Sequence, residues 1–150
     1  MNQKKHDFNL TPSQTMQAYL DSFVENNMDK LFSLFAKEAI VEFPYAFGDL
    51  STKVEGIEAI KNYYQDATKY FEFHKYYDVN IYETNDSNSI VAEFKCDAKT
   101  LSTNKDYPQV YISTLRLENH LIAHYKEYWN PLIVQNAFGG DDPTADAFEK

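Results

Sequence analysis

Several features are scarce in this chain of 150 residues, and each scarcity argues against a class of protein. A single cysteine, Cys96, has no partner for an internal disulfide, and nothing indicates an oxidising compartment. The four glycines lack the spacing of a phosphate-binding loop, so no dinucleotide cofactor is expected. No apolar run is long enough to span a bilayer, and the start, MNQKKHDFNL, lacks the apolar core of a signal peptide. We therefore expect a soluble, cytoplasmic protein.

Positive charge is also scarce. The chain has 14 Lys and Arg residues against 23 Asp and Glu, which gives a net charge of −9 with the histidines neutral. Nucleic acids and anionic membrane surfaces bind clustered Lys and Arg, so neither is expected as a partner. The histidines at positions 6, 74, 120 and 124 do not form a ligand pattern with carboxylates, so we expect no metal site.

Aromatic residues, by contrast, are abundant. The 12 Tyr, 11 Phe and 1 Trp make 16% of the sequence, and 43% of all residues are hydrophobic. A single domain of this length and composition can bury a substantial core. The aromatic rings indicate either a dense core or a pocket for a flat apolar ligand. Composition leaves both interpretations open.

The two ends of the chain differ from its middle. Residues 1–11 are mostly polar, and residues 139–150, GGDDPTADAFEK, carry four acids against one Lys. We expect a flexible N-terminus over 1–11, one domain over residues 12–138, and a flexible acidic tail over 139–150.

Apolar residues with helical spacing predict two longer helices and a short one between them. Thr11 or Ser13 caps the first helix, with Pro12 near its first turn. Gly56 opens the third helix after a loop over residues 48–56. The three apolar sets are Met16, Tyr19, Leu20, Phe23 and Val24; Leu31, Phe32, Leu34 and Phe35; and Ile57, Ile60, Tyr63, Tyr64, Ala67 and Phe71.

Apolar and polar residues alternate through the second half of the chain, which predicts strands. The clearest case has Cys96 on its apolar face, where we expect an inert core thiol. An earlier strand is expected at 39–45. The later strands are predicted at 72–84, 89–100, 108–118 and 121–130, separated by turn-forming residues.

Three helices followed by a four-strand meander, with one early strand joining the sheet, indicate an α+β fold. We expect a cone in which the three N-terminal helices pack in the concavity of a curved, mostly antiparallel β-sheet. That arrangement would bury both the helical and the strand apolar sets.

This order of elements resembles the cone-shaped folds of nuclear transport factor 2 (NTF2), ketosteroid isomerase and SnoaL-type polyketide cyclases. The segments YDVNIYETNDSNSIVAEF (77–94) and LRLENHLIAHYKEYWNPL (115–132) resemble the phenazine-biosynthesis A/B proteins of that superfamily. Those proteins carry a similar "I-aromatic-E-T-x-D" strand and a closing "R-E-aromatic-x-N-P" strand. The resemblance implies an NTF2-like fold, which hosts many reactions and so specifies none by itself.

The ketosteroid isomerase pattern fails when it is carried over residue by residue. Tyr19 falls where that family has its oxyanion-hole tyrosine. The position of the catalytic aspartate is occupied by Phe43, which cannot abstract a proton, and the second oxyanion acid falls near Ser113. Classical steroid isomerisation is therefore not expected.

The phenazine-type pattern is retained better. Its acid/base glutamate, just before Asn-Pro in the closing strand, corresponds to Glu127 in KEYWNP. Its partner histidine on the third helix corresponds to Tyr63, which could still donate a hydrogen bond. The resemblance implies one acid/base residue, Glu127.

Strand alternation places Glu127 on the same face as Tyr125 and Trp129. If that row faces the concavity, the carboxylate is poorly solvated and its pKa rises, as general acid/base catalysis near neutral pH requires. If the row faces solvent, or if Glu127 only bonds a neighbouring tyrosine, the residue is structural.

We expect a set of side chains to surround a ligand beside Glu127. Within this set, Tyr19 is either a pocket donor or a core tyrosine whose hydroxyl has an internal partner. The expected substrate-binding residues are Tyr19, Phe43, Tyr63, Tyr111, Ser113, Tyr125 and Trp129.

The opposite face of the same strands is also apolar. Val110, Ile112 and Thr114 share it with Tyr128, and no helix is left to cover it. We expect a second copy of the chain to do so, which predicts a homodimer through the outer sheet face. His124 falls on this outer face as well.

Two functions from different classes follow. The first is a SnoaL-like enzyme that uses cofactor-independent acid/base chemistry for an isomerisation, cyclisation or condensation of a cyclic or aromatic substrate. Glu127 would transfer the proton, with no metal and no cofactor. The alternative is a non-catalytic module, on the same fold, for binding a small ligand or for dimerisation.

Overall fold

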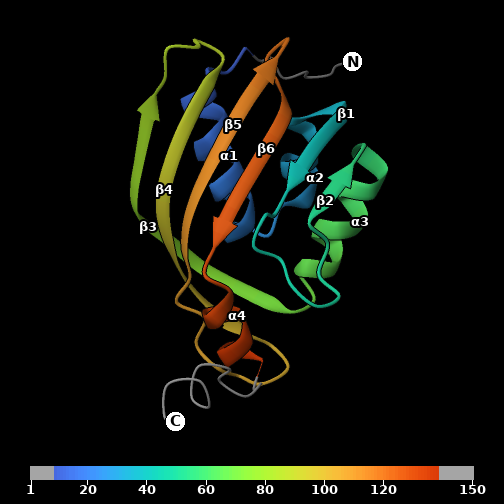
Figure 1. Cartoon of the computed structure of the whole chain (residues 1–150), viewed down its shortest axis with the longest axis vertical. Coiled ribbons are helices and arrows are strands. Elements are labelled where there is room, and N and C mark those ends of the chain that lie inside the picture. Colours follow the sequence, from blue (N-terminus) through green and yellow to red (C-terminus); the bar gives the residue numbers. More distant parts are fainter. Residues whose placement is uncertain (1–8, 139–150) are drawn as a thin grey trace.

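The computed structural model describes residues 9–138, which form four helices and one six-stranded sheet (Figure 1). The strand order is β2-β1-β6-β5-β4-β3, and neighbours are antiparallel except for β1 and β6, which are parallel. The strands are β1 (Phe35–Glu42), β2 (Lys53–Glu55), β3 (Phe71–Glu83), β4 (Ser89–Thr100), β5 (Val110–Glu118) and β6 (Leu121–Trp129).

The first helix, α1 (Pro12–Val24), starts where the sequence indicates. Thr11 is its N-cap, and the Thr11 and Gln14 side chains each bond the other residue's backbone N–H in a capping box. This settles the choice between Thr11 and Ser13. Four residues of the predicted stripe of α1 are buried, Met16, Tyr19, Leu20 and Phe23, but Val24 at the end of the helix is 43% exposed, which the spacing did not predict. The other helices are α2 (Met28–Ser33), α3 (Ile57–Ala67) and α4 (Pro131–Ala137).

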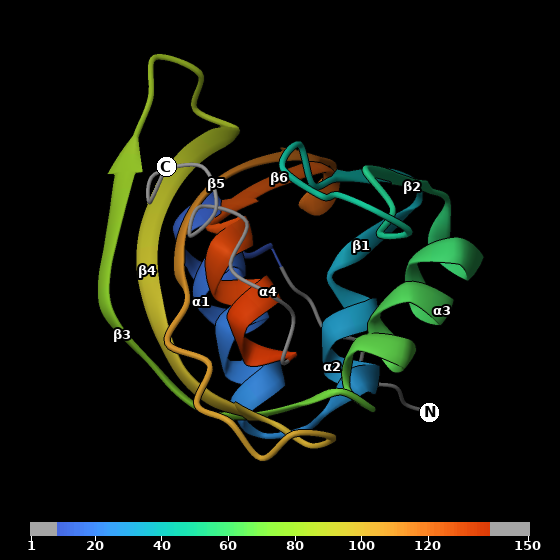
Figure 2. The ribbon, with the colours of Figure 1, turned by 60° about the horizontal axis from the view of Figure 1, so that its bottom comes forward.

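The sheet curves strongly, and α1 lies inside the curve formed by β3, β4, β5 and β6, while α4 lies across one end of it (Figure 2). Two register shifts interrupt the pairing of β3 with β4, one between Phe73 and Lys75 and one between Tyr77 and Asn80. Such irregularities bend a strand and increase its twist, which fits the bowed shape of β3. Helix α3 packs against β1 and β2 on the other side of the opening. The α+β cone predicted from the sequence is confirmed.

The two faces of the sheet have different residues, as the period-two pattern requires. In β4 the alternate residues from Ile90 to Ala98 are buried on the concave face. In β6 a register shift opposite Arg116 and Leu117 leaves Ala123 as an extra residue, so that Ile122 and Tyr125 are both fully buried. Beyond this bulge the alternation continues to the end of the strand.

Several local expectations were wrong. Strand β2 lies within the segment expected to be a loop, because three residues carry too little periodicity to reveal a strand. Leu34 is the C-cap of α2 and Phe35 opens β1, so neither residue continues the second helix, and β1 covers Phe35–Glu42 rather than the expected 39–45. Phe71 begins β3 and does not belong to the third helix, which ends at Ala67.

The fourth helix, α4, was not expected at all. It is one of the shortest elements, and its signals are local: Asn130 caps it by accepting a hydrogen bond from the Leu132 N–H, and Pro131 takes its first position. The helix lies at the end of the sheet where β6 finishes (Figure 1).

The boundaries of the domain, 12–138, stay a prediction. Of the expected tails, residues 1–8 and 139–150 lie outside the described residues. Between residues 9 and 138, no helix combines the length and the apolar character that crossing a membrane would need.

Candidate active site

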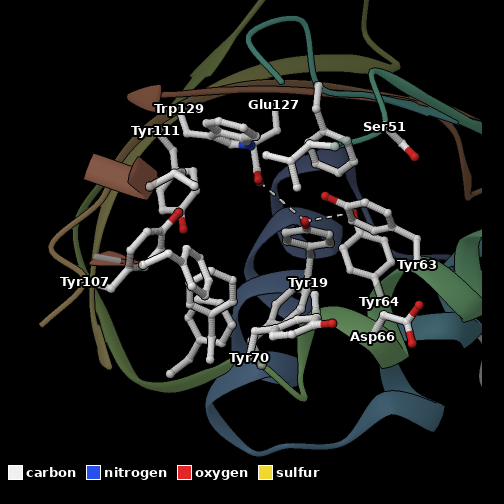
Figure 3. A pocket seen from close by; sticks show the side chains of 18 of the residues that line it. Tyr19, Ser51, Tyr63, Tyr64, Asp66, Tyr70, Tyr107, Tyr111, Glu127 and Trp129 are labelled. Atoms are coloured by element: carbon white, nitrogen blue, oxygen red, sulfur yellow. Dashed lines mark hydrogen bonds between the residues drawn. The ribbon is translucent and has the colours of Figure 1, made fainter. Parts of the chain in front are cut away.

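A cavity of about 480 Å³ lies between the concave face of the sheet and helices α1, α3 and α4 (Figure 3). Of the 20 residues that line it, 13 are aromatic, and they come from every side of the cone. Part of the aromatic excess of the sequence therefore surrounds an open space rather than filling a solid core. A cavity with apolar walls and few polar groups is typical of small-molecule sites.

Glu127 of β6 presents a carboxyl group to this cavity. The residue is only 8% exposed. Removal from water penalises the ionised form, and this burial raises the pKa of Glu127 from 4.5 to about 7, although the hydrogen bonds from Tyr125 and Tyr19 act in the opposite direction. A carboxyl with that pKa exchanges a proton readily near neutral pH.

The hydrogen bonds to Glu127 converge on one of its two carboxyl oxygens. Tyr125 donates to Oε1 at 2.7 Å, and Tyr19 donates to the same atom at 3.4 Å. Each hydroxyl has one proton, so Tyr64 must donate to the Tyr19 oxygen, 3.0 Å away, and Ser113 to the Tyr125 oxygen, 2.8 Å away. These four hydroxyls form a branched donor chain directed at Oε1.

The second carboxyl oxygen, Oε2, receives no hydrogen bond from the described residues. No buried side-chain oxygen lacks a partner within residues 9–138, so Oε2 is not sealed in the core. Because Glu127 lines the cavity, Oε2 is the oxygen that opens into it. The donor chain thus holds Oε1 in place and leaves Oε2 free to carry or accept a proton.

The tyrosines around Glu127 are themselves poor proton donors to bulk water. Burial raises the pKa of Tyr19, Tyr64 and Tyr125, and the nearby Glu127 charge raises each of them further. Tyr63 shifts in the same direction for the same two reasons. All four hydroxyls therefore stay neutral near pH 7, and Glu127 is the group in this cluster that changes charge.

The walls of the cavity are held by ring-to-ring packing. Phe43 stacks on Tyr63 with ring centroids 4.8 Å apart. Tyr111 stacks on Phe94 at 4.7 Å, with an angle of 19° between the ring planes. Such pairs restrict ring motion, so the cavity has a defined shape before any ligand enters.

Most residues singled out in the sequence come together here. Glu127, Tyr19, Phe43, Tyr63, Tyr111 and Trp129 all line the cavity. Ser113 and Tyr125 do not: both are fully buried, the Ser113 hydroxyl bonds the Tyr125 hydroxyl, and Tyr125 donates to Oε1. They were expected to contact a ligand, but in the structure they orient the Glu127 carboxylate instead.

Sequence reasoning missed several lining residues. Tyr64 is buried and bonds Tyr19, and its spacing four residues after the buried Ile60 was the signal that could have placed it. Val134 and Phe138 line the cavity from α4 and its C-cap, and no signal for them was used because α4 was not predicted.

Other reactive side chains lie apart from the carboxylate. Cys96 is fully buried on the concave face, its thiol lies 3.6 Å from the Tyr111 hydroxyl, and burial raises its pKa to about 11. His124 contacts Glu42 and is half-buried, while His74 is exposed. In the described part of the chain, no three His, Cys, Asp or Glu side chains gather as metal ligands.

Residues 16–125 match the SnoaL-like domain family. The chain is 35% identical over 127 residues to the uncharacterised protein YesE of Bacillus subtilis, covering 85% of this chain and 86% of YesE. It is 34% identical over 112 residues to an uncharacterised PhzA/B-like protein of Pseudomonas aeruginosa, covering 75% of this chain and 79% of that one.

Solved structures show the same architecture. A Bacillus subtilis protein provisionally called an isomerase superposes with a TM-score of 0.83 at 34% identity, covering 87% of this chain and 94% of that one. A phenazine biosynthesis-related protein of Pseudomonas aeruginosa, phzb2, superposes with a TM-score of 0.72 at 16% identity, covering 88% and 87%. The second likeness concerns the fold alone. Because residues 16–125 match the family and two relatives are 34–35% identical over most of the chain, the chain belongs to the SnoaL-like domain family.

Proposed function

We propose that this protein is a cofactor-independent acid/base enzyme that isomerises, cyclises or condenses a cyclic or aromatic substrate. One observation carries the proposal: a buried carboxyl with its Oε2 open to an aromatic cavity and its Oε1 held by tyrosines. The pKa of Glu127, raised by burial to about 7, supports it, because such a group both takes and returns a proton near neutral pH.

Each part of the site has a role in this proposal. Glu127 Oε2 removes a proton from the substrate and returns it at another atom. Tyr19 and Tyr125 keep Oε1 oriented, so the carboxylate does not rotate away between the two transfers. The aromatic walls exclude water, which would otherwise compete for the proton.

Fold neighbours support a small ligand as the occupant. A protein of ketosteroid isomerase-like fold from Catenulispora acidiphila is in complex with trimethylamine, with a TM-score of 0.72 at 15% identity. A computationally designed 17-OHP binder has a TM-score of 0.68 at 12% identity. Proteins of this fold therefore include some that bind small organic ligands.

Proton exchange at carbon tests the proposal without the natural substrate. β-Tetralone is a flat bicyclic ketone with acidic C–H bonds beside its carbonyl group, and NMR in deuterated water follows their exchange. The wild type should accelerate this exchange at least about 100-fold over Glu127→Gln. The rate should rise with pH through the pKa of Glu127, about 7.

Glu38→Gln is the matched control, because Glu38 is an exposed carboxylate on β1 that does not line the cavity. Its exchange rate should equal that of the wild type. Equal rates in the wild type and Glu127→Gln would refute the acid/base role.

A non-catalytic ligand-binding module is the second candidate. It is favoured because, among the described residues, Glu127 has no second acid/base residue beside it. Phe43 and Tyr63 occupy the positions where related enzymes have such residues. Under this alternative, aromatic ligands bind, but exchange at carbon is no faster than with Glu127→Gln.

We further propose a homodimer through the outer face of the sheet. Val110 and Ile112 are 49% and 41% exposed there, and Thr114 is exposed beside them. Tyr45 packs on Tyr128 with ring centroids 5.3 Å apart and extends the same apolar area. A partner subunit would remove these side chains from water. The acidic surface would keep such a dimer soluble, in keeping with a cytoplasmic location.

Ile112→Lys tests this dimer, because a lysine at the centre of the contact would be buried without a counter-charge. The variant should sediment as a monomer at roughly tens of micromolar and unfold at lower temperature, since association stabilises a dimer. Val24→Lys is the control: Val24 is 43% exposed at the end of α1, off the sheet, and should leave the dimer intact. A wild type that sediments as a monomer would refute the assignment.

A further inference from the structure

The charged residues that line the cavity all have the same sign. Glu127 is at the inner end, and Asp49 and Asp66 are exposed side chains of the lining. No Lys, Arg or His is among the lining residues of the described chain. Lys69 pairs with Asp66 at 3.3 Å, but it is exposed and outside the lining.

An anionic ligand would find no partner here. Its charge would lose water, meet no basic side chain, and approach Glu127 Oε2, which carries a negative charge once Glu127 is ionised. Moving an unpaired charge out of water is costly, and like charges repel most strongly in a water-poor site. The cavity therefore selects against carboxylates, sulfonates and phosphates.

A cationic ligand meets the opposite situation. The faces of aromatic rings attract cations, and rings such as Tyr19, Tyr63 and Trp129 surround the space beside Glu127 (Figure 3). The carboxylate itself is more than nine-tenths buried and has an unpartnered oxygen aimed into the cavity. An ammonium or ring N–H would give Oε2 the hydrogen bond that the described residues do not supply.

We propose that the cavity is selective for flat organic cations, in which a protonated nitrogen lies among the rings and donates to Glu127 Oε2. This inference names the substrate class of the proposed function and rests on it for the position of Glu127 at the ligand. It does not need turnover, because charge selection is a property of binding.

Cation binding should also release a proton. A positive charge at Oε2 stabilises ionised Glu127, whose pKa is about 7 in the empty cavity, so part of the protein population loses a proton on binding. The titratable groups that face Glu127 are tyrosines and one thiol, and all stay neutral at this pH. They are Tyr19 from α1, Tyr63 and Tyr64 from α3, Tyr76 from β3, Cys96 from β4, Tyr107 and Tyr111 from β5 and the segment before it, and Tyr125 from β6.

Isothermal titration calorimetry with three naphthalenes of one shape tests the inference. Naphthylmethylamine is a cation, naphthylmethanol is neutral and naphthoate is an anion, all substituted at the same ring position. At about pH 8, where Glu127 is mostly ionised, the amine should bind about tenfold or more tighter than the alcohol, and the naphthoate should bind weakest. At about pH 7, titration of the amine in two buffers of different ionisation enthalpy should show proton release.

Glu127→Gln keeps the shape of the side chain and removes its charge. In this variant the amine should lose about tenfold in affinity and approach the alcohol, while the alcohol changes little. Glu38→Gln, with the same change of charge on an exposed strand residue, should retain the wild-type order. These controls separate the cavity carboxylate from the net charge of the protein.

Three results would overturn the inference: naphthoate binding as tightly as the amine, an amine preference unchanged in Glu127→Gln, or no binding of any probe at millimolar concentration. Failure of the proposed function looks different. Charge-selective binding without any exchange of β-tetralone protons would retain the ligand class and remove the acid/base role.

Discussion

Two glutamates near the centre of the sheet are ionised very differently. Glu127 of β6 faces the cavity, while Glu42 of β1, whose strand partner is Lys126, lies beside His124 on the outer side. Burial raises the pKa of Glu127 to about 7. The hydrogen bond with His124 holds the pKa of Glu42 below its ordinary value, and the charges of His124, Lys126 and Lys53 add to that effect.

The contrast teaches that one layer of backbone separates two chemical environments. On the outer face a carboxylate keeps contact with water and has basic neighbours, so its charged form is stable. On the concave face the neighbours are aromatic rings and hydroxyls, which solvate a charge poorly. Only the second environment prepares a carboxyl for proton transfer at neutral pH.

The largest expected effect is on the pH dependence of stability in Glu127→Gln. The fold raises the pKa of this carboxyl from 4.5 to about 7, so folding favours the protonated form. The wild type should therefore lose up to about 3 kcal/mol of unfolding free energy, relative to the variant, as pH rises from about 4.5 to about 7. Urea denaturation across this range measures the difference.

Above the folded pKa the difference should stay constant, and below the unfolded pKa it should vanish, because the carboxyl is then protonated in both states. Glu38→Gln serves as the control, because its unfolding free energy should change with pH as that of the wild type does. Parallel stability curves for the wild type and Glu127→Gln would mean that Glu127 is well solvated, and the contrast with Glu42 would disappear.

A smaller effect is expected from the donors to Oε1. Tyr125 donates at 2.7 Å and Tyr19 at 3.4 Å, and both bonds lower the pKa of Glu127 against the effect of burial. Removing either hydroxyl should raise the pKa further, and Tyr125→Phe should raise it more than Tyr19→Phe. Carbon NMR titration of the Glu127 carboxyl measures the order.

Tyr125→Phe should also lower the free energy of unfolding by about 1–2 kcal/mol, because it leaves the Ser113 hydroxyl without its partner. A fall in the Glu127 pKa in either variant would contradict the donor assignment.

The smallest expected effect has the opposite sign and comes from Glu42→Gln. Since the pKa of Glu42 is lowered in the fold, its contribution to stability is present above the ordinary carboxyl pKa and is lost as pH falls through the folded value. Its side chain is 31% exposed, so the loss at neutral pH should be at most about 1 kcal/mol.

Thermal unfolding at low and high salt checks this last prediction, because screening should weaken a half-exposed pair. A loss of stability that grows with falling pH would show that Glu42 is not held ionised by His124.

The sequence was a good guide wherever periodicity was long. The stripe of α1 and the alternation of β4 placed their buried faces correctly, since several residues in each repeat one spacing. Short elements were not predicted, because β2 has only three residues and α4 only seven, too few to show a repeated spacing. The bulge at Ala123 was not predicted either, because an extra residue in a strand changes neither its composition nor its hydrophobicity.

For the candidate site, the resemblance to phenazine-type proteins singled out Glu127, and alternation placed it between Tyr125 and Trp129. The catalytic and ligand-binding roles of these residues stay predictions. Nothing in the local pattern separated Tyr111, which lines the cavity, from Ser113, two residues later on the same face, which is fully buried. The two residues differ in their tertiary neighbours: Ser113 pairs with Glu127 and bonds Tyr125, whereas Tyr111 pairs with Trp129.

By itself, the sequence determined the α+β class, the concave face of the long strands and the position of one carboxyl among aromatic residues, because local spacing and residue type carry that information. Tertiary structure alone decided that the aromatic residues surround a cavity rather than fill it. It also decided that Tyr19 and Tyr125, from two separate elements, donate to one oxygen of Glu127, and that Tyr64 from a third element bonds the Tyr19 hydroxyl. Contacts between residues more than 40 positions apart depend on how the sheet curves, and no local pattern records that curvature.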